Sequence, residues 1–255
     1  MKKRCWQSFL IKGLVLLYLI PCATLLFPFL KEDISSLFSD FSNTSMRYFV
    51  AYRNTLFVAI GSMIIQWCVS ISAGLALSKF LPEHISRKLR LLCVLLMLLP
   101  QQALILPQYL LLDQMGLLHN LCGVVVMSAF QPFLILLYWF GSEQIETSIL
   151  EAAACEGATG KQSFFRIYLP LISPYILVGS LLSVAESWNL LEQSMTFLQG
   201  DAQVVLSTYF LQQPQSNFSV TVLQALCSAL PLVLFFFFAK AKSHKSINLA
   251  RKTFL

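Results

Sequence analysis

The stretch NTLFVAIGSMIIQWCVSISAGLALS, from Asn54 to Ser78, contains no Asp, Glu, Lys or Arg. A membrane-spanning α-helix needs about 20 consecutive, mostly apolar residues to cross the hydrocarbon core of a bilayer. Lipid cannot satisfy backbone polar groups, so such a run must close its hydrogen bonds within itself, as a helix does. The stretch is therefore predicted to be a transmembrane helix.

The same pattern recurs along the whole chain. Of the 255 residues, 57% are hydrophobic and only 12% are charged, whereas a soluble domain carries about 25% charged residues. Runs without charge cover 13–30, 54–78, 91–112, 114–142, 167–185 and 202–239. We predict an all-α, polytopic membrane protein whose single transmembrane domain, 1–255, has six transmembrane helices at about 11–30, 54–78, 90–108, 121–140, 173–192 and 221–239.

The basic residues predict the orientation in the membrane. With the N-terminus in the cytoplasm, fifteen of the 18 Lys and Arg residues fall inside, and only Lys31, Arg47 and Arg53 fall outside. Cytoplasmic loops of membrane proteins carry such an excess of positive charge. We therefore expect a multi-pass protein with both termini in the cytoplasm. The net charge of +6 follows from the same loops, so no nucleic-acid partner is expected.

The first apolar segment has two interpretations. MKKRCWQSFLIKGLVLLYLIPCATLL, residues 1–26, has the basic head and apolar middle of a cleaved signal peptide. It lacks a clear A-x-A cleavage site before Lys31, and its apolar run is long, so a retained first helix is favoured. The seven Cys residues are scattered and lie mostly within apolar runs, which predicts neither a disulfide framework nor a metal site.

A polar segment interrupts the apolar pattern between the predicted fourth and fifth helices. Residues 141–172 fall on the predicted cytoplasmic side and contain EAAACEGATGKQSFFRIYLP, from Glu151 to Pro170. Its Ala and Glu residues favour a helix that Gly157 can end, and Thr159 can cap a second helix. The spacing of Gly157 and Gly160 does not fit a phosphate-binding loop, so this chain is not expected to hydrolyse ATP.

The segment EAAACEGATGKQSFFRIYLPLISP, residues 151–174, closely resembles the EAA loop of ABC-importer permeases. The pattern of that loop is roughly E-A-A-x-x-D-G-A followed by F-x-x-I-x-L-P, and Glu156 stands where Asp is usual. Other segments resemble sugar-importer permeases of the maltose type: RNTLFVAIGS (53–62), GLALSKF (74–80), LLPQQALILPQYLLLDQMGLLHN (98–120) and ESWNLLEQSMTFLQG (186–200). The resemblance covers about residues 50–240, whereas the C-terminal SHKSINLARKTFL departs from these relatives.

This resemblance implies a subunit of a larger complex in the bacterial cytoplasmic membrane. Its partners would be a dimer of ATP-binding-cassette ATPases, a second homologous permease and an extracytoplasmic solute-binding protein. ATP and magnesium would lie on the ATPases, so this chain would bind no cofactor. The EAA loop would couple the permease to the ATPases through Glu151, Ala152, Ala153, Gly157, Ala158, Phe164, Phe165, Ile167, Leu169 and Pro170. Of these, Glu151 would pair with a basic ATPase residue, and the large apolar side chains would anchor the loop.

Polar residues within or beside transmembrane helices are candidates for a solute pathway, because such groups are costly in lipid. The candidates here are Glu186, Trp188, Asn189, Glu192, Gln66, Gln101 and Gln102. An aromatic ring can stack on the apolar face of a sugar, and polar neighbours can bind its hydroxyl groups. Alternatively, Trp188 is an interfacial anchor and the glutamines join one helix to another.

Two other functions remain open. The same kind of complex could carry a solute that is not a sugar, since the EAA loop does not distinguish the two cargoes. A stand-alone secondary transporter would show inverted repeats and ionisable residues at the membrane midplane, and the sequence shows no clear repeat. The chain is not expected to be an enzyme, because it has no H-E-x-x-H or G-x-S-x-G motif.

Overall fold

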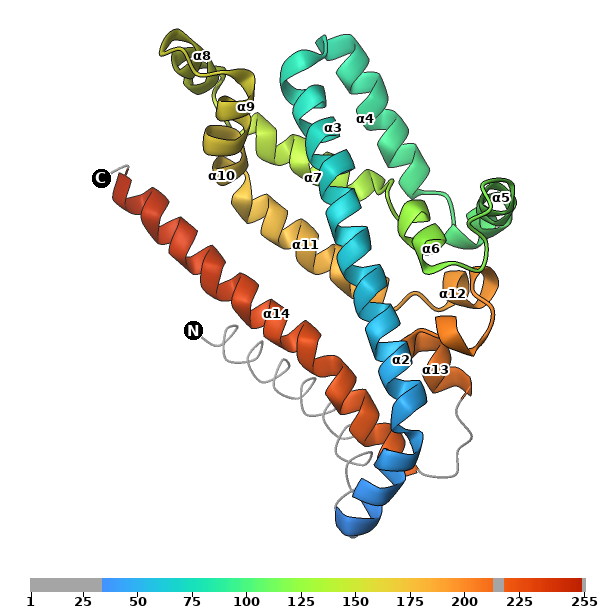
Figure 1. Ribbon diagram of the computed structural model, residues 1–255. Coiled ribbons are helices and arrows are strands. Elements are labelled where there is room, and N and C mark those ends of the chain that lie inside the picture. The colour runs from blue at the N-terminus through green and yellow to red at the C-terminus, as the bar shows by residue number, and fades with distance from the viewer. Residues whose placement is uncertain (1–33, 213–217, 254–255) are drawn as a thin grey trace, which may run out of the picture.

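The computed structural model describes residues 34–212 and 218–253, and all regular secondary structure within these ranges is helical (Figure 1). The prediction of an all-α fold is therefore confirmed. The predicted first helix, at about 11–30, lies outside the described residues. The number of six membrane spans and their bounds remain predictions.

One nearly continuous helix covers residues 34–80 and includes the quoted stretch. It consists of α2 (Ile34–Gln66), the π-helical η2 (Trp67–Ile71), α3 (Ser72–Leu75) and the π-helical η3 (Ala76–Phe80). Its part Met46–Phe80 is long and apolar enough to cross a membrane. The helix ends where Leu81 becomes extended, with φ −94° and ψ 141°, because a residue that precedes proline disfavours the helical conformation.

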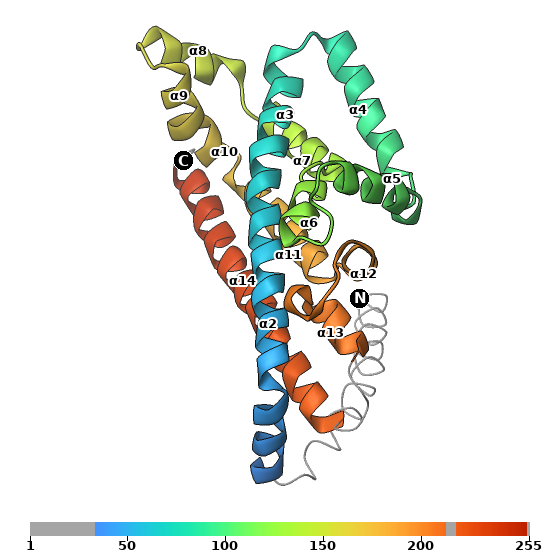
Figure 2. The same ribbon diagram turned by 45° about the vertical axis from the view of Figure 1, so that its right-hand side comes forward.

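The last helix, α14 (Phe218–Thr253), also contains a segment suited to a membrane, Ser219–Phe238. This segment includes most of the predicted helix at 221–239. Pro231 lies inside α14 without ending it, as happens in membrane helices whose neighbours satisfy the freed backbone groups. In Figure 1 α14 begins close to α2 and diverges from it toward its C-terminal end, whereas in the turned view of Figure 2 α14 crosses α2.

The predicted continuous helix at 90–108 is corrected by the structure. Two helices, α4 (Glu83–Met97) and α5 (Gln101–Gln114), cover this region and meet at an angle of 101°. Pro100 causes the break, because its backbone is extended, with ψ 134°, and because proline disfavours a helical conformation in the residue before it. The charge-free run shows a long apolar segment but gives no sign of this bend.

Two further predicted helices are also bent. The region 121–140 contains α6 (Leu121–Met127) and α7 (Pro132–Glu143), which meet at 49° where Gln131 is extended before Pro132. The fifth predicted helix corresponds to α11 (Ser173–Trp188), which follows the segment Gly160–Leu171 at an angle of 72°. If each bent pair is counted as one span, up to five spans fit the described residues by length and composition.

Short helices complete the fold. Between α7 and α11 lie α8 (Thr147–Cys155), α9 (Gly160–Ser163), the π-helical η4 (Phe164–Tyr168) and α10 (Leu169–Leu171). Between α11 and α14 lie α12 (Glu192–Phe197), the 3-10 helix η5 (Asp201–Gln203) and α13 (Leu206–Gln212). The α8 segment, the turn between η3 and α4 and the C-terminal end of α14 lie toward one end of the molecule (Figure 1).

The interior is built where α3, α7 and α11 cross. A Cβ atom on Gly74 of α3 would lie 2.7 Å from the backbone nitrogen of Trp139 in α7. A Cβ atom on Gly179 of α11 would lie 2.3 Å from the hydroxyl oxygen of Tyr138. Small residues of this kind let membrane helices approach closely. These two glycines thus bring both α3 and α11 against Tyr138 of α7.

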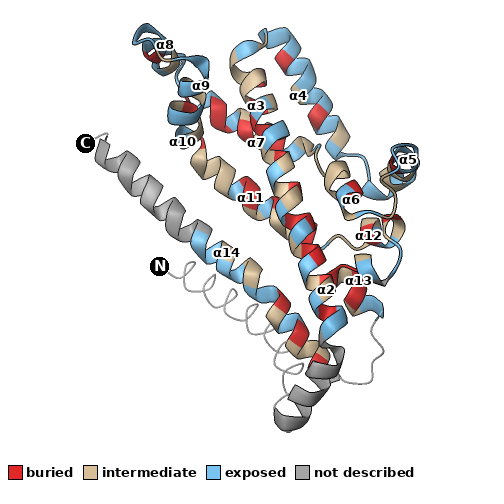
Figure 3. Ribbon diagram, viewed as in Figure 1, coloured by how far each residue is buried: buried red, intermediate tan, exposed pale blue. Residues whose placement is uncertain are grey.

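The outer surface is strongly apolar. Buried residues gather along α2, α7, α11 and α13, while much of α4, α5 and α14 is exposed (Figure 3). Among the exposed side chains are Leu98, Leu106 and Leu234, which are 75%, 67% and 66% exposed. Exposed apolar surface of this extent is unusual for a monomeric soluble protein and typical of a helix surface covered by lipid or by another subunit.

Candidate functional site

The polar segment predicted at 141–172 folds as a helix–turn–helix. Helix α8 ends at a turn in which Gly157 has a φ of +84°, a conformation that glycine adopts without steric cost. The N–H of Ala158 donates to the carbonyl oxygen of Ala153, and the N–H of Gly157 donates to that of Ala154, both at 3.0 Å. These two bonds form a Schellman motif, so the prediction that Gly157 ends the helix is confirmed.

The next helix begins at Thr159, as predicted. The Thr159 hydroxyl oxygen accepts from the N–H of Gln162 at 3.4 Å, and the Gln162 side-chain oxygen accepts from the N–H of Thr159 at 2.9 Å. This reciprocal arrangement is a capping box, which satisfies backbone donors at the start of a helix. The turn from α8 to α9 is thus specified by residues within the turn itself.

Phe164 and Leu169 fix this segment to the rest of the chain. Both side chains pack against a buried cluster that includes Tyr138, Tyr168 and Ile172, and the ring of Phe164 stacks on Tyr168 with centroids 5.5 Å apart. Phe165 does not share these contacts, because its side chain is 64% exposed. The period of the helix turns Phe165 away from the interior when Phe164 faces it.

Hydrogen bonds also join the segment to the transmembrane helices. The Ser142 hydroxyl, near the C-terminal end of α7, donates to the carbonyl oxygen of Tyr138, and lies 2.6 Å from the Tyr168 hydroxyl. Since the Ser142 proton is already used, the Tyr168 hydroxyl is the donor in this pair. The Lys79 ammonium of η3 donates to the carbonyl oxygen of Ile145 at 2.6 Å. The segment is thus connected to η3 at its start and to α7 near its end.

The outward face of the segment carries Glu151, Ala152, Gly157, Phe165 and Pro170, all of which are exposed. The Glu151 carboxylate makes no hydrogen bond or ion pair with any residue in the described ranges. Ala153 differs from the prediction because it is only 7% exposed and packs inward. Ala158 and Ile167 are partly buried. The exposed residues among those predicted for coupling are therefore one carboxylate without a partner in the described ranges, small residues and one aromatic ring.

A cavity of about 480 Å³ lies where α2, α4, α5, α7 and α11 approach one another. This volume is within the usual range of small-molecule sites, about 300–1,000 Å³. Its polar lining is dominated by side-chain amides, from Gln66, Gln101, Gln108, Gln131 and Gln193, together with Glu186. Leu96, Met97, Phe130, Phe133 and Leu190 are among its apolar lining residues. We call this space the central cavity.

Glu186, in the last turn of α11, is held by two glutamines from other elements. Its Oε1 accepts from the Gln101 amide at 3.4 Å, and its Oε2 accepts from the Gln131 amide. The next residue of α5, Gln102, donates to Glu192 Oε1 of α12 at 3.1 Å. The break before α5 therefore places two consecutive glutamines against two glutamates. Of the sequence candidates, Gln66, Gln101 and Glu186 line the central cavity, and Gln102 and Glu192 form a neighbouring pair.

Two amide oxygens of the central cavity have no partner among the described residues. The Gln66 amide nitrogen donates to the carbonyl oxygen of Ser128 at 2.7 Å, but its Oε1 atom is buried and unpaired. The Oε1 atom of Gln108 is also buried and unpaired. A buried acceptor without a donor costs about 1–3 kcal/mol. Both atoms thus offer hydrogen-bond positions to a bound molecule or to water.

Trp188 and Asn189 do not line the central cavity. Trp188 is 8% exposed and packs edge-on against Tyr52 of α2, with ring centroids 6.2 Å apart. A neighbouring helix thus covers part of this ring, and its stacking on a sugar stays a prediction. The Asn189 amide instead donates to the carbonyl oxygen of Ala185 at 2.8 Å, at the end of α11.

Three cavity glutamines escaped the sequence analysis, namely Gln108, Gln131 and Gln193. The position of Gln131 just before Pro132, in an otherwise apolar run, is a signal that could have identified it. An extended residue before proline directs its side chain away from the helix that follows. Gln108 follows Pro107 instead of preceding a proline, so this signal does not mark it, and nothing local marks Gln193.

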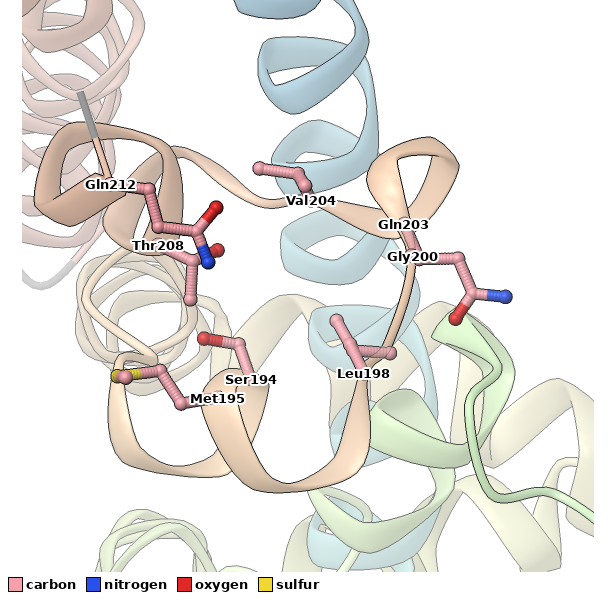
Figure 4. Close-up of a pocket in the computed structure, with 8 residues that line it drawn as sticks. All are labelled: Ser194, Met195, Leu198, Gly200, Gln203, Val204, Thr208 and Gln212. Carbon is pink, nitrogen blue, oxygen red and sulfur yellow. The ribbon is translucent and has the colours of Figure 1, made fainter. Parts of the chain in front are cut away.

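A second cavity, of about 260 Å³, lies on the other side of α12 (Figure 4). Ser194 and Met195 of α12 contribute to one wall, and Thr208 and Gln212 of α13 lie across from them (Figure 4). Gln193, between these neighbours in sequence, lines the central cavity instead. The single helix α12 therefore separates the two cavities. The Arg47 guanidinium donates to Oε1 of Gln212, one of the lining residues, at 3.2 Å.

Comparison with known proteins identifies relatives of this chain. The family described as "Binding-protein-dependent transport system inner membrane component" matches residues 69–247. A probable ABC transporter permease protein of Pyrococcus horikoshii is 30% identical over 155 residues, which cover 60% of this chain and 56% of that protein. The probable starch degradation products transport system permease protein AmyC of Thermoanaerobacterium thermosulfurigenes is 28% identical over 203 residues, which cover 75% of this chain and 71% of that protein.

A solved structure has the same fold. One chain of a bacterial ABC transporter involved in the import of the acidic polysaccharide alginate superposes with a TM-score of 0.75 and 20% sequence identity. The superposition covers 92% of this chain and 96% of that chain. The family match spans most of the sequence, including the helix–turn–helix at 147–171 and most of the residues of the central cavity. This chain belongs to the family of inner membrane components of binding-protein-dependent transport systems.

Proposed function

We propose that this chain is one permease subunit of an ATP-driven importer of carbohydrate. In this proposal it forms the pathway with a second permease, receives its solute from an extracytoplasmic binding protein and is driven by separate ATPase subunits. The observation that carries the proposal is the exposed helix–turn–helix at 147–171, which two helices connect to a glutamine-lined cavity. Helix α7 runs from Pro132 at the cavity to Ser142 beside Tyr168, and α11 runs back from the segment to Glu186.

The outward face of the helix–turn–helix suits an ATPase surface. The unpaired Glu151 carboxylate can form a charge-assisted hydrogen bond with an Arg or Lys of the ATPase, which is about twice as strong as a neutral one. Ala152 and Gly157 add little bulk, so the two backbones can approach closely. Phe165 is exposed and can enter an apolar pocket of the partner. We name residues 147–171 the coupling segment.

The central cavity supports a carbohydrate as the solute. Amide side chains both donate and accept hydrogen bonds, so they match the hydroxyl groups that surround a sugar ring. Phe130 and Phe133 line the same cavity and are 54% and 41% exposed, so these rings can stack on the apolar face of a sugar. The relative named for starch degradation products agrees with this class of solute.

The proposed orientation places the coupling segment in the cytoplasm of a bacterial cell. The turn between η3 and α4 and the C-terminal end of α14 then lie on the same side, with both termini in the cytoplasm. Arg47, in the N-terminal half of α2, then lies on the outer side. The basic residues around 79–90 and 161–166 support this orientation.

Affinity purification of the tagged chain in mild detergent tests the proposal. A P-loop ATPase and a second helical membrane protein should co-purify with the native chain. Glu151→Lys should abolish recruitment of the ATPase and ATP-dependent uptake while the chain still inserts into the membrane. The matched control is Glu143→Lys, which reverses the charge of an exposed glutamate at the end of α7, outside the coupling segment.

Two outcomes would contradict this reading. Full transport by the Glu151→Lys variant would remove the coupling role of that residue. A native chain that purifies alone and transports solute in liposomes without ATP would instead be a stand-alone secondary transporter.

A further inference from the structure

We propose that the central cavity accepts neutral, hydroxyl-rich solutes and rejects acidic ones, and that Glu186 sets this preference. The inference rests on the carbohydrate-import function proposed above and refines it to one class of carbohydrate. Two independent features of the cavity carry it: the charge of its lining and the kind of hydrogen-bonding atom that its lining leaves free.

The charge of the lining is negative. Among the described residues that line the central cavity, Glu186 is the one with a formal charge, and the remaining polar side chains are amides and hydroxyls. No Lys, Arg or His belongs to this described lining. The neighbouring pair of Gln102 and Glu192 adds a second carboxylate close to the first turn of α5. An acidic sugar would therefore enter a space that holds carboxylates and no compensating cation.

The size of this effect follows from Coulomb's law. Two unit charges about 8 Å apart, at an effective dielectric constant of about 20, repel enough to change a dissociation constant by about 30-fold. A sugar bound in a cavity of this volume cannot place its carboxylate much farther from Glu186. Salt weakens such repulsion when the charges are partly exposed to solvent, so the preference should be largest at low ionic strength.

The free hydrogen-bonding atoms of the cavity favour the same class. The unpaired buried atoms are Gln66 Oε1 and Gln108 Oε1, and both are acceptors. A sugar hydroxyl can donate to them, whereas an ionised carboxylate has only acceptors. One N–H of each of the Gln101 and Gln131 amides is already used by Glu186. A solute carboxylate would thus find these two donors occupied, and the unpaired buried acceptors could not bind it.

The position of Glu186 is fixed from two sides. Gln101 belongs to the start of α5, and Gln131 lies in the turn between α6 and α7. Their two hydrogen bonds hold the carboxylate at the cavity wall and reduce its freedom to turn toward solvent. Because glutamine has nearly the same shape as glutamate, Glu186→Gln removes the charge with little change of volume.

The fold alone does not set this preference. The solved chain with the same fold comes from a transporter involved in the import of an acidic polysaccharide. A scaffold that serves an acidic polymer in one protein can serve neutral solutes in another if the residues along its cavity differ. The residues that line the cavity of this chain thus decide the class of solute.

The test measures binding of matched sugars to the purified complex of this chain with its co-purified partners in nanodiscs. The binding protein is left out, because it has a specificity of its own. The probes are galactotriose and maltotriose, each paired with its derivative oxidised at one C6, so that the members of each pair differ by one carboxylate. Dissociation constants come from saturation-transfer difference NMR at low and high salt, for the native complex, Glu186→Gln and the control Glu143→Gln.

In the native complex the neutral sugar of a pair should bind about 30-fold more tightly than its acidic counterpart at low salt. Glu186→Gln should remove most of this ratio, mainly by improving the binding of the acidic sugar, and Glu143→Gln should leave it unchanged. Equal native affinities within the pairs, or a ratio that survives Glu186→Gln, would overturn the inference and leave the import function intact. Absence of binding by all four sugars to an assembled complex would overturn the inference and the carbohydrate cargo together.

Discussion

Replacing Gly74 by alanine should push α3 away from α7. The added Cβ atom would lie 2.7 Å from the backbone nitrogen of Trp139 and 2.8 Å from the carbonyl carbon of Tyr138. Ordinary van der Waals contacts at such positions are 3.4–4 Å. The nearest atoms belong to the backbone, so no side chain can rotate to relieve the contact. The two helices must therefore separate by about 1 Å, and the buried side chains between them must repack.

Overpacking of this kind costs about 1–3 kcal/mol. For a chain of this size, a loss of about 2 kcal/mol lowers the melting temperature by about 4–8 °C. The assay is thermal melting of the tagged protein in mild detergent, followed by the fraction that remains monodisperse in size-exclusion chromatography. Gly160→Ala is the matched control, because a Cβ atom at Gly160 meets nothing within 4 Å.

The reasoning is refuted if Gly74→Ala and Gly160→Ala melt within about 1 °C of each other. Such a result would mean that α3 and α7 are farther apart than the structure places them, or that they separate at no cost. A loss of stability confined to Gly74→Ala would confirm that the close crossing of these helices stabilises the fold.

Two further changes test contacts elsewhere in the chain. Asn54→Leu should lower stability by about 2 kcal/mol. The reason is that the buried Asn54 amide donates to the carbonyl oxygens of Ala202 and Val204, both at 2.9 Å. A melting temperature like that of the native chain would show that these bonds contribute nothing. Gly157→Ala should destabilise the end of α8 by about 1 kcal/mol, because alanine is strained at positive φ; amide hydrogen exchange at Ala158 should accelerate, and unchanged exchange would contradict the role of the turn.

The sequence predicted the positions of the helices better than it predicted their bends. Long runs without charge located the apolar segments, because a helix in lipid must avoid charged side chains along its whole length. The runs did not distinguish Pro100, where the chain bends by 101°, from Pro107, which lies inside α5. Whether a proline bends a membrane helix depends on the neighbours that satisfy the freed carbonyl groups, and those neighbours come from distant parts of the sequence.

The coupling segment was predictable for a local reason. The glycine turn and the threonine cap act within a few residues of themselves, so their effect is visible in the sequence. The central cavity is formed by contacts between distant helices, such as that of Glu186 with Gln101 and Gln131. For the same reason the contact of Trp188 with the ring of Tyr52 was not predictable. The cavity is lined by several amides and one carboxylate. This combination can be recognised only when the helices that carry these residues are in place.

Helix α7 can act as a lever arm between the two sites. It has 12 residues and is therefore about 18 Å long. Because the helix is about 18 Å long, a tilt of about 10° about one end displaces the other end by about 3 Å. Three ångströms is close to the diameter of a water molecule or a sugar hydroxyl. A small rotation of α7, imposed at its contact with Tyr168, is therefore enough to change the width of the central cavity near Phe133. Every hydrogen bond within α7 stays intact during this movement.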